Sequence, residues 1–311
     1  MNDAANSIAT IVSTRVLPPW VAVGWAAFFN MAAVFTFGVA VATTIGKGIV
    51  DPAIVTPWLV LAALVGAILW SAGCTKLGLP ISVSHALIGG LAGAGVAHCG
   101  TDVLVADGLG KVALFIVVSP LLGLVLSYLL MVAVFWIFRR WTPRRVDRFF
   151  RVGQLVSSAA FSLGHGSNDA QKTMGIIAVL LFSTGYLDTF GVPTWVVFAS
   201  YASISLGTLL GGWRVIRTMG MGLTDLKPVG GFCAETGGAL SIFVASFLGI
   251  PVSTTHTIAG SIVGVGATVN PSAVRWGVAG RIVWAWLLTI PCSAFLSALV
   301  VWMIDLAGRT A

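Results

Sequence analysis

GLPISVSHALIGGLAGAGVA, residues 78–97, recurs without a gap as GIPVSTTHTIAGSIVGVGAT, residues 249–268. Seven positions are identical in the two stretches: Gly78/Gly249, Pro80/Pro251, Ser82/Ser253, His85/His256, Gly89/Gly260, Gly93/Gly264 and Gly95/Gly266. The triplet Asn2-Asp3-Ala4 recurs as Asn168-Asp169-Ala170, in the same order relative to the longer repeat. The offsets of 171 and 166 residues are nearly equal. The chain is therefore predicted to consist of two copies of one structural unit.

The composition indicates that both copies lie in a membrane. The chain has 311 residues, of which 58% are hydrophobic and 9% are charged, and its mean hydropathy is +1.00. A typical soluble chain carries about 25% charged residues, so this chain has too few to cover a water-soluble particle. The composition excludes a cytosolic enzyme, a nucleic-acid-binding protein and a secreted domain. It indicates an integral membrane protein.

The membrane segments are predicted to be helices. A helix needs roughly 20 apolar residues to span a bilayer, and runs of this kind recur along the chain. They cover residues 20–45, 57–76, 80–96, 111–138, 152–186, 194–213, 228–248, 251–269 and 282–304. The 37 glycines lie in the apolar runs without the alternation of a membrane β-barrel, and small residues let helices pack closely. We expect an all-α, polytopic helical bundle.

Each half is expected to contain two interrupted elements. The run at 152–186 is interrupted by GHGSND, and each long repeated stretch carries a proline near its start. We therefore expect a segment broken at Asn-Asp, a spanning helix, a proline-tipped re-entrant hairpin and a second spanning helix in each half. VGQLVSSAAFSLGHGS precedes Asn168-Asp169, whereas only Met1 precedes Asn2-Asp3. The first repeat is therefore expected to be truncated, without the front arm of its broken helix.

The charges predict how the two halves are oriented. The segment RRWTPRRVDRFFR at 139–151 holds six arginines against Asp147, and cytoplasmic loops collect such residues. Acidic lipid and nucleic acid also bind basic clusters, but a short loop between spanning segments favours a cytoplasmic anchor. We predict a first repeat at 1–138, a basic cytoplasmic loop at 139–151 and a second repeat at 152–311. Three crossings per half would invert the second repeat, which is the architecture of a secondary transporter.

Three carboxylates lie within or beside apolar segments. They are Asp3, Asp169 and Glu235. A carboxylate at membrane depth costs about 3 kcal/mol, so such residues face the protein interior and usually contact an ion, a proton or a substrate. Capping of a helix near the membrane interface is the alternative for the aspartates. Glu235 is the single glutamate of the chain and its repeat partner is Leu64, so its role is not symmetric; a proton or a cation is its expected partner.

The two proline-tipped stretches predict an anion site. Residues 80–85 and 251–256 each open a short helix with hydroxyl side chains beside the proline. The first turn of a helix leaves several N–H groups unpaired, and the helix dipole adds positive potential there. Ordinary N-capping by serine and threonine is the alternative. Two copies at matched positions favour a shared site, with the two helix ends facing each other near the membrane midplane.

Other polar residues are ambiguous. His85 and His256 are either ligands or structural histidines, and Lys172, three residues after Asp169, is placed to neutralise it on one helix face. The four cysteines show no metal-binding spacing, and we expect neither a metal site nor a cofactor. No hydrolase or nucleotide-binding motif is present. A membrane-embedded hydrolase stays a distant alternative, although a catalytic triad needs one copy and here the whole constellation is duplicated.

Three stretches resemble the signatures of the inorganic phosphate transporter (PiT) family. They are NDAANSIATIVSTR at 2–15, GHGSNDAQKTMG at 164–175 and PVSTTH at 251–256. The resemblance extends from Asn2 to the C-terminal helix. It implies a multi-pass protein of the bacterial inner membrane that imports inorganic phosphate with H⁺ or Na⁺ and is often a homodimer. Many members carry a glutamate in the hairpin of each half, whereas this chain has Leu64 opposite Glu235.

The residues and the resemblance together predict three groups of site residues. The substrate-binding group is Asp3, Ser82, Ser84, Asn168, Asp169, Ser253, Thr254 and Thr255. The coupling-ion group is Asn2, Asp3, Asn6, Asp169 and Glu235. His85, His256 and Lys172 are expected to support them. The expected partners are phosphate, the coupling cation and membrane lipid, without nucleic acid.

A mechanism follows as a hypothesis. Amides and hydroxyls at the hairpin tips would donate to phosphate oxygens. Asp3 and Asp169 would either accept from a phosphate O–H or bind the coupling cation. Sulfate has no proton to donate, so the carboxylates would reject it. A sulfate permease on the same scaffold is the alternative. Rocking of one repeat against the other would expose the site to each side in turn.

Overall fold

The computed structural model describes residues 2–36 and 38–308. Apart from one isolated β-bridge, between Val50 and Leu104, the regular structure of these residues is helical. Four of the described helices are long and apolar enough to cross a membrane, and six spans result if each of two bent helix pairs is one span. Large apolar side chains such as Trp136 and Ile137 are exposed on the outside, as lipid contact requires. The predicted all-α polytopic architecture is confirmed.

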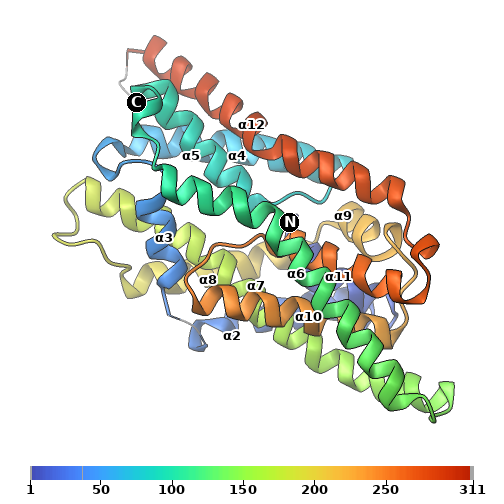
Figure 1. Cartoon of the computed structure of the whole chain (residues 1–311). Coiled ribbons are helices and arrows are strands. Elements are labelled where there is room, and N and C mark those ends of the chain that lie inside the picture. Colours follow the sequence, from blue (N-terminus) through green and yellow to red (C-terminus); the bar gives the residue numbers. More distant parts are fainter. Residues whose placement is uncertain (1, 37, 309–311) are drawn as a thin grey trace.

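The helices fall into two matching series. The first consists of α1 (Ala4–Ser13), α2 (Pro19–Ala32), α3 (Ala40–Gly48), α4 (Pro57–Leu77), α5 (Val83–Cys99) and α6 (Ala106–Phe138). The second consists of α7 (Pro143–Ser183), α8 (Thr194–Leu209), α9 (Trp213–Arg217) with a π-helical turn (Thr218–Gly222), α10 (Pro228–Phe247), α11 (Thr254–Val269) and α12 (Trp276–Leu306). Short 3₁₀ turns lie at Ala33–Phe35, Pro52–Ile54, Thr101–Val103 and Pro271–Ala273. In Figure 1, α6 and α12 run in opposite directions, as inverted repeats require.

Helices α4 and α5 form the hairpin of the first series, and α10 and α11 form that of the second. One helix of each hairpin packs against the last helix of the other series. Helix α5 of the first half packs along α12 of the second, and α11 packs along α6. The repeated glycines make both contacts possible, because a Cβ atom on Gly93 would overlap the carbonyl oxygen of Ala294, and one on Gly264 would overlap that of Leu124. Small residues at such contacts let helix backbones approach closely. Each half therefore contributes one hairpin to the packing of the other.

The predicted break at Asn168-Asp169 is wrong. Helix α7 runs without interruption from Pro143 to Ser183, through the whole GHGSND stretch. Two of its side chains reach other helices while the backbone stays helical: His165 Nδ1 lies 3.1 Å from Asn30 Oδ1 on α2, and Asn168 Nδ2 donates to Ser246 Oγ on α10. Gly166 serves close packing, since a Cβ atom there would lie 2.8 Å from the Cα atom of Asn30 on α2.

The expected basic loop at 139–151 is mostly helical. Proline is favoured in the first turn of a helix, and α7 begins at Pro143, so only residues 139–142 connect α6 to α7. The helical register brings Arg151 Nε within 2.9 Å of Asp147 Oδ2. The limits of the two repeats and the side of the membrane that this segment faces stay predictions.

One predicted span is sharply bent, and a second ends at a sharp bend. The run at 20–45 contains α2 and most of α3, which meet at 88°. The run at 194–213 contains α8 and ends at the first residue of α9, which meets α8 at 71°. Gly211, with a φ of 69°, follows the end of α8 in a conformation that favours glycine. The interrupted elements of each half are thus a bent pair and a hairpin.

Candidate functional site

The tips of the two hairpins meet inside the protein. Thr255 Oγ1 at the start of α11 donates to the carbonyl oxygen of Ile81, which precedes α5, over 3.1 Å. The ring centroids of His85 and His256 lie 4.8 Å apart. The first turns of two helices from opposite repeats therefore face one interior region.

Serine caps both helices in the same way. The hydroxyl oxygens of Ser82 and Ser253 each accept from the backbone N–H three residues later, at 3.2 Å. The prolines lie two residues before these caps, outside the helices, contrary to our expectation that they begin them. The caps satisfy one amide of each first turn and leave the preceding amides without intrahelical partners. Both alternatives of the sequence analysis are thus present, N-capping and an amide-rich helix end.

The links that lead into the tips are fixed by matching contacts. Gly78 and Gly249 follow α4 and α10 with φ angles of 71° and 68°, which an L-residue rarely adopts. Their carbonyl oxygens accept at 2.8 Å from Thr218 Oγ1 and Thr44 Oγ1, respectively. Helix α3 of the first repeat therefore contacts the segment between α10 and α11, and the π-helical turn after α9 contacts the segment between α4 and α5.

Asn2 and Asn168 also bind the hairpin links. Asn2 Nδ2 donates to Thr75 Oγ1 and to the carbonyl oxygen of Leu79, both at 3.1 Å. Asn168 Nδ2 donates to Ser246 Oγ at 2.9 Å. These amides thus connect the carboxylate-bearing segment of each repeat to the hairpin of the same repeat.

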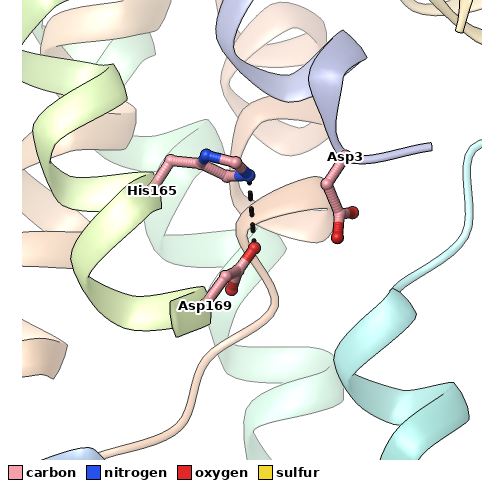
Figure 2. A group of neighbouring side chains, drawn as sticks. All are labelled: Asp3, His165 and Asp169. Atoms are coloured by element: carbon pink, nitrogen blue, oxygen red, sulfur yellow. Dashed lines mark ion pairs between the residues drawn. The ribbon is translucent and has the colours of Figure 1, made fainter. Parts of the chain in front are cut away.

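Asp3 and Asp169 face each other beside the tips. Figure 2 shows Asp3, next to the start of α1, pointing toward the region that Asp169 and His165 reach from α7. Ligand atoms of these three residues all lie within 4.8 Å of one another, a spacing at which a metal ion or other cation can be held. The Asp169 side chain is 7% exposed, and its Oδ2 lies 3.2 Å from His165 Nε2. The structure thus brings together the two aspartates that the sequence analysis assigns to one site, and their roles stay predictions.

Lys172 neutralises Asp169, as the spacing predicts. Its Nζ donates to Asp169 Oδ1 at 2.6 Å, to Ser84 Oγ at 2.8 Å and to the carbonyl oxygen of Val252 at 2.5 Å. The lysine is 2% exposed. Its ammonium group thus connects α7 to both hairpin tips.

Asn6 occupies a similar place beside Asp3. Its Nδ2 donates to Asp3 Oδ1 at 3.2 Å, to Thr254 Oγ1 at 3.2 Å and to Thr255 Oγ1 at 2.9 Å. Thr254 in turn donates to Asp169 Oδ2 at 2.8 Å. One first turn, that of α11, therefore contacts both carboxylates.

His256 has a structural position. Pro120 lies inside α6 and lacks an N–H, so the carbonyl oxygen of Ile116 loses its helical partner. His256 Nδ1 lies 3.4 Å from that oxygen, and its ring stacks on Trp286 with centroids 3.9 Å apart. These contacts favour the structural alternative for His256.

Glu235 lies in a separate buried cluster. Its Oε1 accepts from Thr10 Oγ1 at 2.6 Å and from Gln154 Nε2 at 3.1 Å, and its Oε2 accepts from Ser157 Oγ at 2.5 Å. Thr10 is seven residues after Asp3, which corresponds to about 10 Å along a helix. The structure therefore does not bring Glu235 to the aspartate pair. The sequence pattern does not predict its partners, although Gln154 and Ser157 are polar residues in an apolar run.

This architecture defines a class of protein. Inverted repeats, bent helices and a polar site between facing hairpin tips are typical of secondary transporters. The sequence matches the phosphate transporter family over residues 1–297, and the chain belongs to that family. It is a multi-pass membrane protein of a transporter family, and it is not an enzyme.

Relatives match over nearly the whole chain. A probable low-affinity inorganic phosphate transporter of Rhizobium meliloti (strain 1021) is 60% identical, over 99% of this chain and 92% of its own. A protein of Bacillus subtilis (strain 168) with the same description is 41% identical, over 98% and 92%. Among solved structures, a sodium-dependent phosphate transporter superposes with a TM-score of 0.87 and 28% identity, covering 98% of this chain and 94% of that one.

Proposed function

We propose that this protein imports inorganic phosphate across the bacterial inner membrane, driven by H⁺ or Na⁺. The observation that carries the proposal is the meeting of two helix N-termini, from opposite repeats, beside a pair of buried aspartates. Helix N-termini bind oxyanions, and buried carboxylates in membranes bind protons or cations. The names of the relatives supply the choice of phosphate.

In this proposal the hairpin tips hold the phosphate. The first-turn amides and the hydroxyl of Ser84 donate to its oxygens. The hydroxyls of Thr254 and Thr255 do so once they turn away from Asp169 and the Ile81 carbonyl. Asp3 and Asp169 accept from its O–H or hold the coupling cation against it. Sulfate offers the same acceptors but no proton, so a site with two acceptors of this kind discriminates against it.

The remaining predicted residues act around this centre. Asn2 and Asn168 position the hairpins, and Ser82 and Ser253 cap the helices that start at the hairpin tips. All four residues therefore act on phosphate binding indirectly. Asn6 belongs with Asp3 at the coupling cation. Since Glu235 sits apart, its proposed role is a separate proton or cation site on the pathway.

The orientation follows from the arginines at 139–151, which we place in the cytoplasm. Residues 1–138 and 152–311 then rock against each other around the tips. A homodimer, which the family resemblance implies, stays a prediction that light scattering of the purified protein would test.

Uptake of radiolabelled phosphate into proteoliposomes tests the proposal, with the H⁺ and Na⁺ gradients varied independently. We expect concentrative uptake driven by at least one gradient and unaffected by a tenfold excess of sulfate. Strong competition by sulfate would favour the sulfate permease. Chemical conversion of a substrate without flux would favour a membrane-embedded hydrolase.

A further inference from the structure

The two repeats place chemically different groups beside their aspartates. The offset of 166 residues that pairs Asp3 with Asp169 also pairs Asn6 with Lys172. An uncharged amide in one half therefore corresponds to an ammonium group in the other.

The surroundings of these two groups share two contacts. Each nitrogen contacts the Oδ1 atom of the aspartate in its own repeat, at 3.2 Å for Asn6 and 2.6 Å for Lys172. Each also contacts a matching hydroxyl of the opposite hairpin, Thr255 at 2.9 Å and Ser84 at 2.8 Å, and Asn6 has a further contact with Thr254 at 3.2 Å. Thr255 and Ser84 are themselves partners at the offset of 171 residues.

A backbone carbonyl completes each set. Lys172 Nζ donates to the carbonyl oxygen of Val252. Ile81 is the repeat partner of Val252, and in the other half its carbonyl oxygen accepts from Thr255 Oγ1. A carboxylate, a hydroxyl and a carbonyl oxygen thus converge in both halves. Oxygen donors of these kinds are the ligands that hard cations such as Na⁺ and Ca²⁺ prefer.

In the second half this set already surrounds a cation. An ammonium group has three N–H donors, and Asp169, Ser84 and Val252 accept all three. No donor of Lys172 remains for a phosphate oxygen. Lys172 therefore occupies the position of a cation rather than that of a phosphate ligand.

In the first half the same set is not filled by a charged group. Among the residues that the structure describes, no lysine or arginine pairs with Asp3. Asn6 is 1% exposed, and its Oδ1 has no hydrogen-bond partner among the described residues. Rotation of this amide by half a turn directs Oδ1 toward Asp3 and Thr255, where it adds a further oxygen ligand.

We propose that Lys172 is a tethered cation that replaces one exchangeable coupling cation. Of the two repeat-related oxygen sets, only the one beside Asp3 and Asn6 exchanges its cation during transport. The protein then moves one cation fewer per phosphate than a carrier in which both sets exchange. This inference rests on the proposed function, because it concerns the stoichiometry of the same transport cycle.

The K172N variant tests the inference, because it places the residue of the first half in the second. Proteoliposomes are loaded to a fixed phosphate gradient, and the opposing Na⁺ or H⁺ gradient that stops net flux gives the number of cations per phosphate. We expect K172N to require one cation more than the wild type. K111N, at an exposed position on α6, is the control and should keep the wild-type number.

Equal coupling numbers for K172N and the wild type would overturn the inference while leaving phosphate transport intact. Absence of phosphate flux in the wild type would instead overturn the proposed function. If K172N does not transport, cation binding is measured instead through the midpoint of thermal unfolding in detergent. NaCl is replaced stepwise by N-methylglucamine chloride, at two pH values. The unfolding midpoint of K172N should rise more steeply with the concentration of Na⁺ or H⁺ than that of the wild type, and identical dependences of the two midpoints would refute the inference.

Discussion

Replacing Asp169 by asparagine leaves the Lys172 ammonium group buried without its carboxylate. The two side chains are 7% and 2% exposed, and 2.6 Å separates their charged atoms. Removing one partner of a buried pair typically costs about 3–5 kcal/mol, whereas replacing both by apolar groups is often close to neutral. We therefore expect D169N to be destabilised by about that amount and D169N/K172M to recover most of it, within the ~1–2 kcal/mol of the lost hydrogen bonds.

Transport should separate from stability in this series. D169N and the double variant should both lose concentrative phosphate uptake, because each lacks the carboxylate, although both still reach the membrane. Reversible unfolding in mixed micelles gives the stabilities, and uptake into proteoliposomes gives the activity. D107N, an exposed position at the start of α6, is the matched control and should change neither.

Two results would refute this reasoning. If D169N accumulated phosphate at the wild-type rate, Asp169 would have no part in coupling. The second concerns the single variants D169N and K172M. If the double variant lost as much unfolding free energy as the two single variants together, the two charges would not stabilise each other, and their contact would contribute little energy.

Three further changes test other parts of the structure. G93V should separate α5 from α12, since its side chain would overlap the Ala294 carbonyl, and should lower the thermal midpoint by several degrees, whereas G110V, with open space around its Cβ position, should not. G249A should cost about 1–2 kcal/mol of unfolding free energy because of its φ of 68°, and should weaken phosphate uptake; unchanged stability would argue against backbone strain at this link. E235A leaves three buried donors unpaired and should cost more in an unfolding assay than the ~1–3 kcal/mol of one unpaired donor, while E235Q keeps an acceptor and should cost less; equal losses would show that the donors find other partners.

The sequence predicts the features that the repeat itself encodes. Both hairpins, their facing tips and the aspartate pair follow from residues 78–97 and 249–268 and from the two Asn-Asp pairs. The reason is physical, since glycines at a fixed spacing, capping serines and carboxylates in apolar runs each have few stable placements in a membrane.

Other features depend on contacts between distant segments. The stretch around Asn168 resembles a helix break when it is considered alone, but Asn168 Nδ2 donates to Ser246 on a neighbouring helix and α7 stays continuous. The isolation of Glu235 from the aspartates depends likewise on Gln154, which lies 81 residues away. Local patterns do not reveal such partners.

The packing of each hairpin against the other half has a consequence for biosynthesis. The ribosome synthesises α5 long before α12, the helix against which the glycines of α5 pack. The glycine face of α5 therefore has no helix partner in the bilayer until the chain is almost complete. The segments can insert one by one, but the first hairpin reaches its final packing only after α12 is inserted. Nascent chains that stop before residue 276 should therefore be recognised by membrane quality-control proteases rather than persist as half-sized carriers.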